Sequence, residues 1–451
     1  MQDNTLIDTL GHAETITGLG ARLRSGALSC VELVQGTLAR IEAANPRLNA
    51  FTFIARAAAL EQAAIRDAEL TAGRDRGPLH GIPVAVKDNI DTADMPTTNG
   101  SRFFADNRPL SDARCVENLR RAGAIIIGKT VTSEFALGPT GEFSLQGAAR
   151  NPHDTARMTG GSSAGSACAV ASGLVTCAVG SDTGGSIRIP SAFCGVVGLK
   201  PTFGSVSVEG VFPVSETLDH IGPIARNEKD AAILFAALQG VAVPDSEGES
   251  DARVGWLDAL ELIDIDADIL KTVLARVASV FGDNVRPALL PDGLLVQARH
   301  CVKTILLSQA YHLHEQRLAQ HRQLFCAPVA ERASHGAGIL ASEYLAALEG
   351  QAIFQSALER LFERFDVLIL PTAAVTAPKV GDTAVSINAV QHTVNDAASA
   401  LTAPWNLSGY PALSLPVGTV GAMPVGVQII SRPGTDFWLL DLAARSGLAV
   451  R

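Results

Sequence analysis

The sequence predicts an α/β fold in which one α/β core carries a helical excursion. From about residue 80, short apolar runs alternate with segments of helical length, a pattern typical of a sheet rich in parallel strands. Of the 451 residues, 47% are hydrophobic and 18% are charged, which is sufficient for a large buried core. No internal repeat or low-complexity linker divides the sequence. We therefore expect one domain rather than several.

The first 75 residues are expected to be helical. The segment 29–46 (SCVELVQGTLARIEAANP) begins with Ser29 and has Glu32 three residues later, the pattern of a capping box. Its apolar residues recur at helical spacing. The alanine-rich segment 55–73 is a second predicted helix, which ends at Gly73.

The next part of the chain carries the alternating pattern. Apolar runs such as GIPVAVKD and AIIIGKT are predicted to be buried strands, and SDARCVENLRRAG between them is predicted to be a helix. The expected strands cover 81–88, 124–130, 174–180, 196–201 and 252–258, and the expected helices cover 111–123, 162–173 and 227–240. After these, 265–364 is mostly helical, and strands return over 365–374, 411–417 and 425–431.

Charge and composition exclude several classes of partner and location. The formal charge of −10 disfavours nucleic acid and anionic membranes, because both attract basic surfaces. The start of the chain lacks the pattern of a signal peptide, and no apolar run approaches the 18–20 residues or so that span a bilayer. The seven cysteines include no CxxC pair, so we expect buried, reduced thiols in a cytoplasmic protein.

Two turns contain a glycine pair directly before a serine. Ser186 ends DTGGS after the strand-like run 174–180, and Ser162 follows TGG 24 residues earlier, at the start of a predicted helix. Glycines leave backbone N–H groups free, so a serine there is a candidate nucleophile beside an oxyanion hole. An ordinary strand-to-loop turn explains either motif equally well. We expect the two turns to meet at one edge of the sheet.

A serine nucleophile requires a base, and none of the histidines falls in these turns. Lys87 ends the apolar strand PVAVK. Burial among apolar neighbours lowers the pKa of a lysine and allows it to accept protons near neutral pH. The alternative is a surface pair between Lys87 and Asp88.

Together these residues resemble the amidase signature family of serine hydrolases. Lys87 in HGIPVAVKDNI, Ser162 in GGSSAGSA and Ser186 in DTGGSIRIPSAFCGVVGLKPT occur in the family's order, with its spacing of 24 residues between the serines. The resemblance implies a large, mixed, twisted β-sheet covered by helices on both faces. It also implies one amidase domain over 1–451, with N-terminal helices (1–75), a signature core (76–240), a helical excursion (265–364) and C-terminal strands and helix (365–451).

The resemblance also implies a role for each residue of the site. Ser186 would be the nucleophile, Ser162 would follow a cis peptide bond from Gly161 and relay protons, and Lys87 would be the neutral base. No cofactor and no metal are implied. The oxyanion hole would use backbone N–H groups, substrate would lie against the segment EFALG, and an ion pair would brace the turn; the residues are Thr183, Gly184, Gly185 and Ser186, then Ala136, then Asp182 and Arg188.

The implied reaction is cleavage of a C–N bond in alkyl or aryl amides, with carbamates (urethanes) and esters as further substrates. The expected partner is such a small molecule, and the expected state is a monomer or homodimer. We expect the pocket walls to come from 134–138, 303–311 and 338–354, which are rich in Leu, Ile and Ala and lack an arginine to hold a carboxylate. An apolar pocket favours neutral aryl substrates over glutamine.

Four other interpretations remain. The amidase subunit of glutamyl-tRNA amidotransferase is similar, although 131–137 reads VTSEFAL rather than that subunit's usual NMDEFAM style. GSSAG matches G-x-S-x-G with Ser163 as nucleophile, but we expect no strand before it. His312, His314 and His321 could suggest a metal site, yet their spacing fits a solvated helix face better. A catalytically silent subunit is disfavoured because all three catalytic residue types are present.

Overall fold

The computed structural model describes residues 14–245 and 252–450. The helices are α2 (Ile16–Arg24), α3 (Cys30–Leu48), α4 (Arg56–Thr71), α5 (Arg114–Arg121), α6 (Ala164–Ala171), α7 (Arg188–Cys194), α8 (Glu228–Gln239), α9 (Ala267–Phe281), α10 (Leu294–His321), α11 (Ala327–Ser334), α12 (Ala341–Phe362), α13 (Val394–Ser399), α14 (Pro404–Ser408) and α15 (Asp436–Ser446). The strands are β1 (Phe51–Ile54), β2 (Pro83–Lys87), β3 (Ile125–Thr130), β4 (Arg150–Asn151), β5 (Asp154–Met158), β6 (Cys177–Asp182), β7 (Val197–Lys200), β8 (His220–Ala225), β9 (Val254–Leu257), β10 (Val285–Ala288), β11 (Val367–Pro371), β12 (Ala384–Ile387), β13 (Val390–Thr393), β14 (Ala412–Val420) and β15 (Met423–Ile430).

One sheet of 11 strands forms the centre of the molecule, in the order β1-β3-β2-β6-β8-β7-β14-β15-β11-β9-β10. Strand β2 runs parallel to β3 and β6, and β9 runs parallel to β10 and β11, while the remaining neighbours are antiparallel. The mixed sheet is confirmed. The expectation of a sheet rich in parallel strands is wrong, because β8 returns antiparallel between β6 and β7 and the C-terminal strands form a hairpin.

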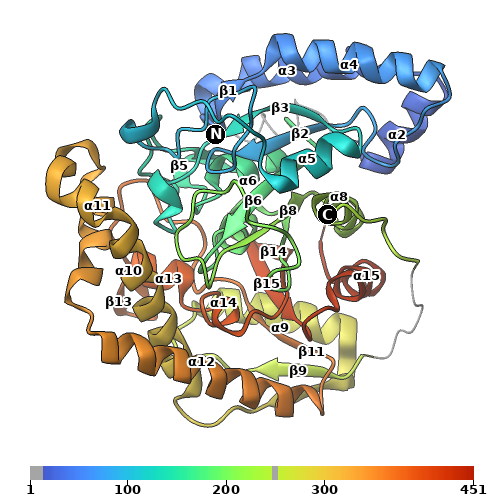
Figure 1. The fold of residues 1–451 in the computed structure, drawn as a ribbon. Coiled ribbons are helices and arrows are strands. Elements are labelled where there is room, and N and C mark those ends of the chain that lie inside the picture. Colours follow the sequence, from blue (N-terminus) through green and yellow to red (C-terminus); the bar gives the residue numbers. More distant parts are fainter. Residues whose placement is uncertain (1–13, 246–251, 451) are drawn as a thin grey trace.

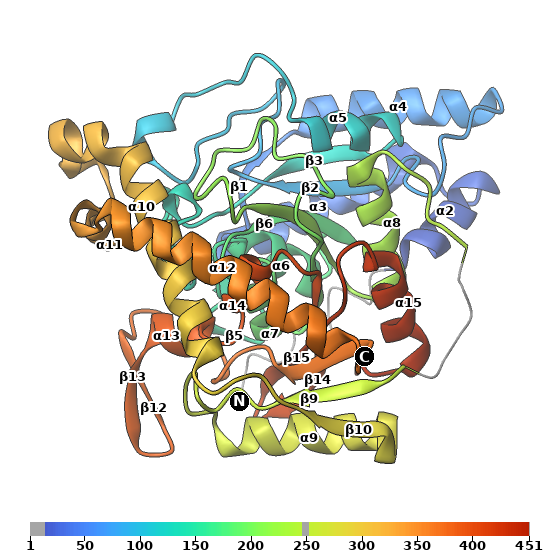
Figure 2. The same ribbon diagram turned by 60° about the horizontal axis from the view of Figure 1, so that its bottom comes forward.

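Helices cover both faces and one end of this sheet (Figures 1 and 2). The blue N-terminal helices α3 and α4 lie at the end formed by β1 and β3, whereas α9 lies at the opposite end near β9 and β10 (Figures 1 and 2). Helices α6 and α7 pack against the central strands, and α8 packs against β7 and β8. Helices α10, α11 and α12 form the helical excursion along one side of the molecule (Figure 2).

Most of the predicted elements are present. Helix α3 begins after Ser29, whose Oγ accepts the Glu32 N–H at 3.1 Å while the Glu32 carboxylate accepts the Ser29 N–H at 2.9 Å, so the capping box is confirmed. Two strands lie where none was predicted. Strand β10 interrupts the helical excursion, and β5 pairs with β4 in a short hairpin directly before the first Gly-Ser turn.

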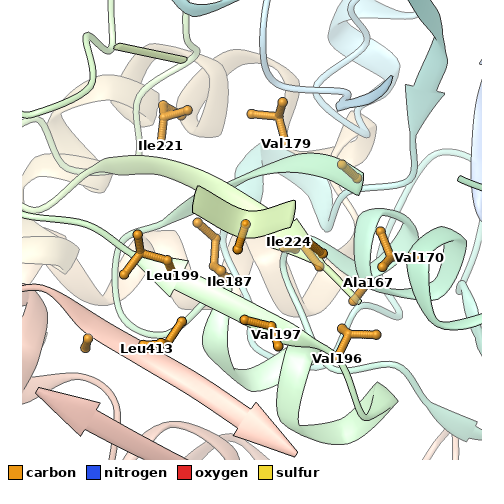
Figure 3. Packing of buried hydrophobic residues seen from close by; sticks show 14 of the residues in the cluster. Ala167, Val170, Val179, Ile187, Val196, Val197, Leu199, Ile221, Ile224 and Leu413 are labelled. Atoms are coloured by element: carbon orange, nitrogen blue, oxygen red, sulfur yellow. The ribbon is translucent and has the colours of Figure 1, made fainter. Parts of the chain in front are cut away.

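Three glycines on neighbouring strands bring helix α7 close to the sheet. A Cβ added at Gly180, Gly198 or Gly222 would lie 3.0, 2.9 or 3.1 Å from atoms of the Ile187 side chain. Such distances are too short for a side chain at any of the three positions, so the glycines provide the space that Ile187 fills. Figure 3 shows Ile187 among Ile224, Val197 and Leu199. Because Ile187 directly follows Ser186, this packing fixes where the second Gly-Ser turn lies.

The thiols and helices agree with the composition. All seven cysteines are free thiols, and six of them are buried. Within the two described ranges, no helix combines the length and the apolar character that crossing a membrane requires. The expectation about a signal peptide concerns mainly residues 1–13, which lie outside the described residues.

Candidate active site

The two Gly-Ser turns meet at the edge of the sheet. The first joins β5 to α6 and carries Ser162, and the second joins β6 to α7 and carries Ser186. The Ser163 N–H donates to the Ser186 carbonyl at 3.1 Å, which ties the turns together. The peptide bond between Gly161 and Ser162 is cis. Gly185 has a φ of +129°, and a Cβ there would collide with Thr402 Oγ1, so this position requires glycine.

Lys87 lies beneath the turns, at the end of β2. Its Nζ donates to Ser162 Oγ at 2.8 Å and to Ser181 Oγ at 2.7 Å, and the side chain is fully buried. Burial lowers the pKa of Lys87 to about 7, although the negative charges of Asp182 and Asp219 act in the opposite direction. The alternative of a surface pair with Asp88 is therefore wrong, because both side chains are 0% exposed.

Ser181 is a member of the site that the sequence did not single out. Its Oγ accepts a hydrogen bond from Asn89 Nδ2 at 3.2 Å as well as from Lys87. A neutral lysine has two N–H bonds and one lone pair. If Ser181 accepts from Lys87, the lone pair is free to face Ser162. Ser181 directly precedes the DTGGS turn, and that position is the one sequence signal that could have identified it.

A buried ion pair holds the second turn in place. The Asp182 carboxylate accepts two hydrogen bonds from Arg188, at 3.1 Å from Nε and 3.0 Å from Nη2. It also accepts the N–H groups of Gly185 at 2.7 Å and Ile187 at 3.0 Å. Burial raises the pKa of Asp182, but the charge and hydrogen bonds of Arg188 outweigh burial and hold this pKa well below its usual value. The turn thus folds around a permanent negative charge.

Three of the four expected oxyanion donors are free. Among the described residues, none accepts a hydrogen bond from the backbone N–H of Thr183, Gly184 or Ser186. The Gly185 N–H differs, because it donates to Asp182. A backbone N–H that is committed to a carboxylate is not available to a substrate oxygen.

Ser186 opens into a cavity of about 450 Å³. Its side chain keeps a small exposed fraction, 9%, whereas Ser162 and Lys87 have none. The cavity walls come from several parts of the chain; the lining residues are Ala136, Leu137, Gly138, Pro139, Thr183, Gly184, Ser186, Ile189, Val214, Arg299, Val302, Lys303, Leu306, Leu307, Pro328, Glu331, Arg332, His335, Thr393, Asn395, Asp396, Ser399 and Ala403.

The walls differ from the expected ones in two respects. The segment 338–354 contributes no residue to this lining, and its place is taken by residues from α11 and from 393–403. The expectation of an apolar pocket without an arginine is also wrong, because Arg299 and Arg332 both line the cavity. The sequence did not reveal them because α11 and the first part of α10 reach the site only through the tertiary fold.

The two arginines have different partners. Arg299 forms an ion pair with Asp396. The Nε of Arg332 is buried and has no hydrogen-bond partner within the described part of the chain. Burial lowers the pKa of Arg332, and the nearby charge of Asp396 opposes this effect. An arginine fork remains charged in proteins, so Arg332 presents an unsatisfied cation to the cavity.

The segment 134–138 is held at the cavity by contacts on both sides. Ala136 lines the cavity with a φ of +55°, and its N–H donates to the Ser133 carbonyl at 2.8 Å. The Glu134 carboxylate accepts Ser101 Oγ and the Cys326 N–H, each at 2.7 Å. Ala136 can therefore contact a substrate, but its N–H is already paired.

The G-x-S-x-G alternative does not fit the geometry. Strand β5 does precede this motif, contrary to expectation. Ser163 nevertheless is fully buried, donates from Oγ to the Ser181 carbonyl at 3.1 Å, and is absent from the lining of the cavity. A serine in this position is not accessible to a substrate.

The histidine cluster of α10 is not one solvated face. His312 and His321 are more exposed, but His314 is 2% exposed and its ring centroid lies 4.3 Å from that of Phe135. Burial lowers the pKa of His314 to about 3, so it is neutral. In the described ranges, no group of three or more His, Cys, Asp or Glu side chains could hold a metal ion.

Comparisons with known proteins match the whole arrangement. The family model described as Amidase matches residues 32–440. The chain is similar to a glutamyl-tRNA(Gln) amidotransferase subunit from Symbiobacterium thermophilum, at 37% identity over 93% of each chain. It is also similar to the peptide amidase from Stenotrophomonas maltophilia, with 30% identity and a TM-score of 0.80 over 98% of this chain and 99% of that one.

A third similar protein comes from a structure described as an unexpected vestigial protein complex that reveals the evolutionary origins of an s-triazine catabolic enzyme. Its TM-score is 0.90 and its identity is 31%, over 96% of this chain and 98% of that one. Sequence and structural relatives therefore agree over nearly the full length. The chain belongs to the amidase signature family of hydrolases.

Proposed function

We propose that the chain hydrolyses the C–N bond of a small amide that carries a carboxylate or a similar anionic group, through an acyl-enzyme on Ser186. The observation that carries this proposal is the 2.8 Å contact between the buried Lys87 Nζ and Ser162 Oγ, directly beneath the cavity that contains Ser186. A lysine whose pKa is about 7 is a competent base near neutral pH.

In the proposed acylation, Ser162 passes its proton to the Lys87 lone pair and takes the proton of Ser186. Ser186 Oγ then attacks the amide carbon, and the carbonyl oxygen becomes an oxyanion. The free N–H groups of Thr183, Gly184 and Ser186 are the proposed donors to that oxyanion. Such donors typically contribute about 10²–10³ each in rate.

Collapse of the tetrahedral intermediate reverses the proton route. The Lys87 ammonium returns its proton through Ser162 to the leaving nitrogen, so the C–N bond breaks and a neutral amine or ammonia departs. A water molecule then attacks the ester on Ser186 in the same way and releases the carboxylic acid. No proton has to leave for bulk solvent during acylation, which suits a base that is fully buried.

The choice of substrate rests on Arg332. An unsatisfied guanidinium beside the nucleophile favours a carboxylate at that distance over an uncharged aryl group, because Arg binds carboxylates in a planar fork. This proposal replaces the expected preference for anilides and aryl carbamates. The test is an activity screen of carboxylated amides such as glutamine against neutral amides, nitroanilides and nitrophenyl carbamates, with Ser186→Ala as the blank. Activity confined to neutral aryl substrates would contradict the proposed substrate class.

A second candidate function is release of ammonia by this chain as the amidase component of a protein complex. It is favoured by the relatives named as amidotransferase subunits, the first of which matches 93% of this chain, and by the neighbour from a vestigial complex. The protein would then copurify with a larger partner from its own cells and hydrolyse glutamine faster in its presence. A chain that stays a monomer or homodimer and reaches full turnover alone would contradict this function.

A further inference from the structure

A buried carboxylate joins the oxyanion turn to the opposite wall of the cavity. Asp219 accepts Thr183 Oγ1 on one oxygen at 2.5 Å, and on the other it accepts the N–H groups of Val214 at 2.9 Å and Ser215 at 3.1 Å. The side chain is 7% exposed. Thr183 and Val214 both line the cavity, so Asp219 lies behind two of its walls.

Thr183 is the one residue in the middle of the turn that can be held by a side chain. Asp182 before it is held by Arg188, and Gly184 and Gly185 after it have no side chains. The Gly184 carbonyl accepts Thr402 Oγ1 at 2.8 Å, which fixes the far side of the turn. The orientation of the peptide between Asp182 and Thr183, which carries a free N–H, therefore depends on how the Thr183 side chain is anchored.

The anchor itself is held by the helical excursion. Ser215 Oγ donates to Gln309 Oε1 at 2.7 Å, and Gln309 Nε2 donates to the Tyr344 hydroxyl at 2.9 Å. Gln309 lies on α10 and Tyr344 on α12. The N–H groups that fix the Asp219 carboxylate thus belong to a loop that is tethered to both helices.

We propose that Asp219 is a positioning residue for the oxyanion hole: its carboxylate holds the Thr183 hydroxyl so that the Thr183 backbone N–H faces the cavity. The inference rests on the proposed function, since it assigns a partner to one of the proposed oxyanion donors. Without this contact the Thr183 side chain is free to rotate, and the flexible glycines beside it allow the peptide to turn away.

The same carboxylate also acts on the base. Its negative charge raises the pKa of Lys87, and the Lys87 charge in turn lowers that of Asp219. Burial raises the pKa of Asp219 to about 6 against the hydrogen bonds from Thr183, Val214 and Ser215. The other charged groups of this region are Asp182 and Arg188, which already neutralise each other. Loss of Asp219 should therefore affect the pH profile as well as the rate.

The test compares single and double variants by kcat, KM and the rate of Ser186 phosphonylation by a fluorophosphonate, whose phosphoryl oxygen requires the same donors. Asp219→Ala is expected to lower kcat and the labelling rate by about tenfold to hundredfold, with a much smaller change in KM. Thr183→Val should lose a similar factor, and Thr183→Ser much less because it keeps the hydroxyl. The double variant Asp219→Ala/Thr183→Val should lose no more than either single one, because the two residues act as a unit.

Asp436 provides a matched control. It is another buried carboxylate that accepts a threonine hydroxyl and a backbone N–H, both from Thr202, at 2.6 and 2.7 Å, but it does not line the cavity. Asp436→Ala is expected to lose stability and keep its labelling rate. In folded Asp219→Ala, the acid limb of kcat/KM should also move to lower pH, which a purely structural role would not cause.

Two outcomes would overturn the proposal. One is a folded Asp219→Ala protein that keeps the wild-type labelling rate and kcat, and the other is a double variant whose losses multiply. Failure of the proposed function is distinguishable, because the wild type itself would then not be labelled at Ser186.

Discussion

Lys87 Nζ lies 2.8 Å from Ser162 Oγ although the two residues are 75 positions apart and both are fully buried. No carboxylate of the described residues lies at hydrogen-bond distance from this amine, so its neutral form is favoured. Lys87→Arg should therefore lower kcat/KM by about 10³-fold or more, because a guanidinium does not deprotonate in this pH range. Steady-state kinetics of Lys87→Arg and Lys87→Met measure this loss. Near wild-type turnover by the arginine variant would contradict a lysine base.

The rate should depend on pH through the same lysine. Because the pKa of Lys87 is about 7, the free enzyme binds a proton there below that pH and loses its base. We expect kcat/KM to rise from about pH 6 and to level off above about pH 8. A pH profile with a neutral substrate and one with a carboxylated substrate should show the same acid limb. A limb near about 10, the range of an exposed lysine, would count against burial of the base.

Stability should also depend on pH at this site. Between about pH 7 and about pH 10 the unfolded chain carries a proton on Lys87 and the folded chain does not. The unfolded state then binds more protons, so the free energy of unfolding rises with pH across this window. Urea unfolding of wild type and Lys87→Met at several pH values within this window isolates the effect. We expect the wild type to gain on the variant as pH rises, and a difference independent of pH would refute the assignment.

The identity of the nucleophile can be read directly. Ser186 is the one catalytic serine with exposed surface, and it lines the cavity. Peptide mass spectrometry after treatment with a fluorophosphonate should find the adduct on the peptide that contains Ser186. Ser163, which is buried and bonded to the Ser181 carbonyl, serves as the internal comparison. An adduct on Ser163 would revive the G-x-S-x-G interpretation.

The substrate class depends on the cavity arginine. Arg332→Met should raise KM for carboxylated amides by about 10-fold to 100-fold, the range for loss of a hydrogen bond to a charged group, and should affect neutral amides much less. Arg322→Met is the matched control, because Arg322 lies near α11, donates to Ser334 Oγ at 2.7 Å, and does not line the cavity. Equal effects on charged and neutral substrates would mean that Arg332 is structural.

The residues that the sequence identified are those with a strong local signal. Lys87 ends an apolar strand, Ser162 and Ser186 follow glycine pairs, and Ser29 with Glu32 forms a capping box. Each signal lies within a few residues and reflects local backbone chemistry. The resemblance to the amidase signature family then supplied the large mixed sheet, which local patterns alone had predicted as rich in parallel strands.

The residues that the sequence did not identify depend on contacts between distant segments. Asp219 and Arg332 are ordinary charged residues in the sequence, and only the fold brings them behind the turn and into the cavity. His314 was expected on a solvated face, but phenylalanines from 103–104, 135, 212 and 325 gather around α10 and bury it or its neighbours. Strand β5 was missed because its polar residues DTARM carry no apolar alternation.

The depth at which Ser186 lies is specified by atoms that are missing. Gly180, Gly198 and Gly222 belong to three adjacent strands, yet their shared effect is a hollow of the size of one isoleucine side chain, directly under the nucleophile. A single methyl group on any of these strands would raise Ile187 and carry Ser186 with it, away from Ser162. The catalytic distance is therefore encoded on β6, β7 and β8, and the sheet acts as a gauge block for the active site.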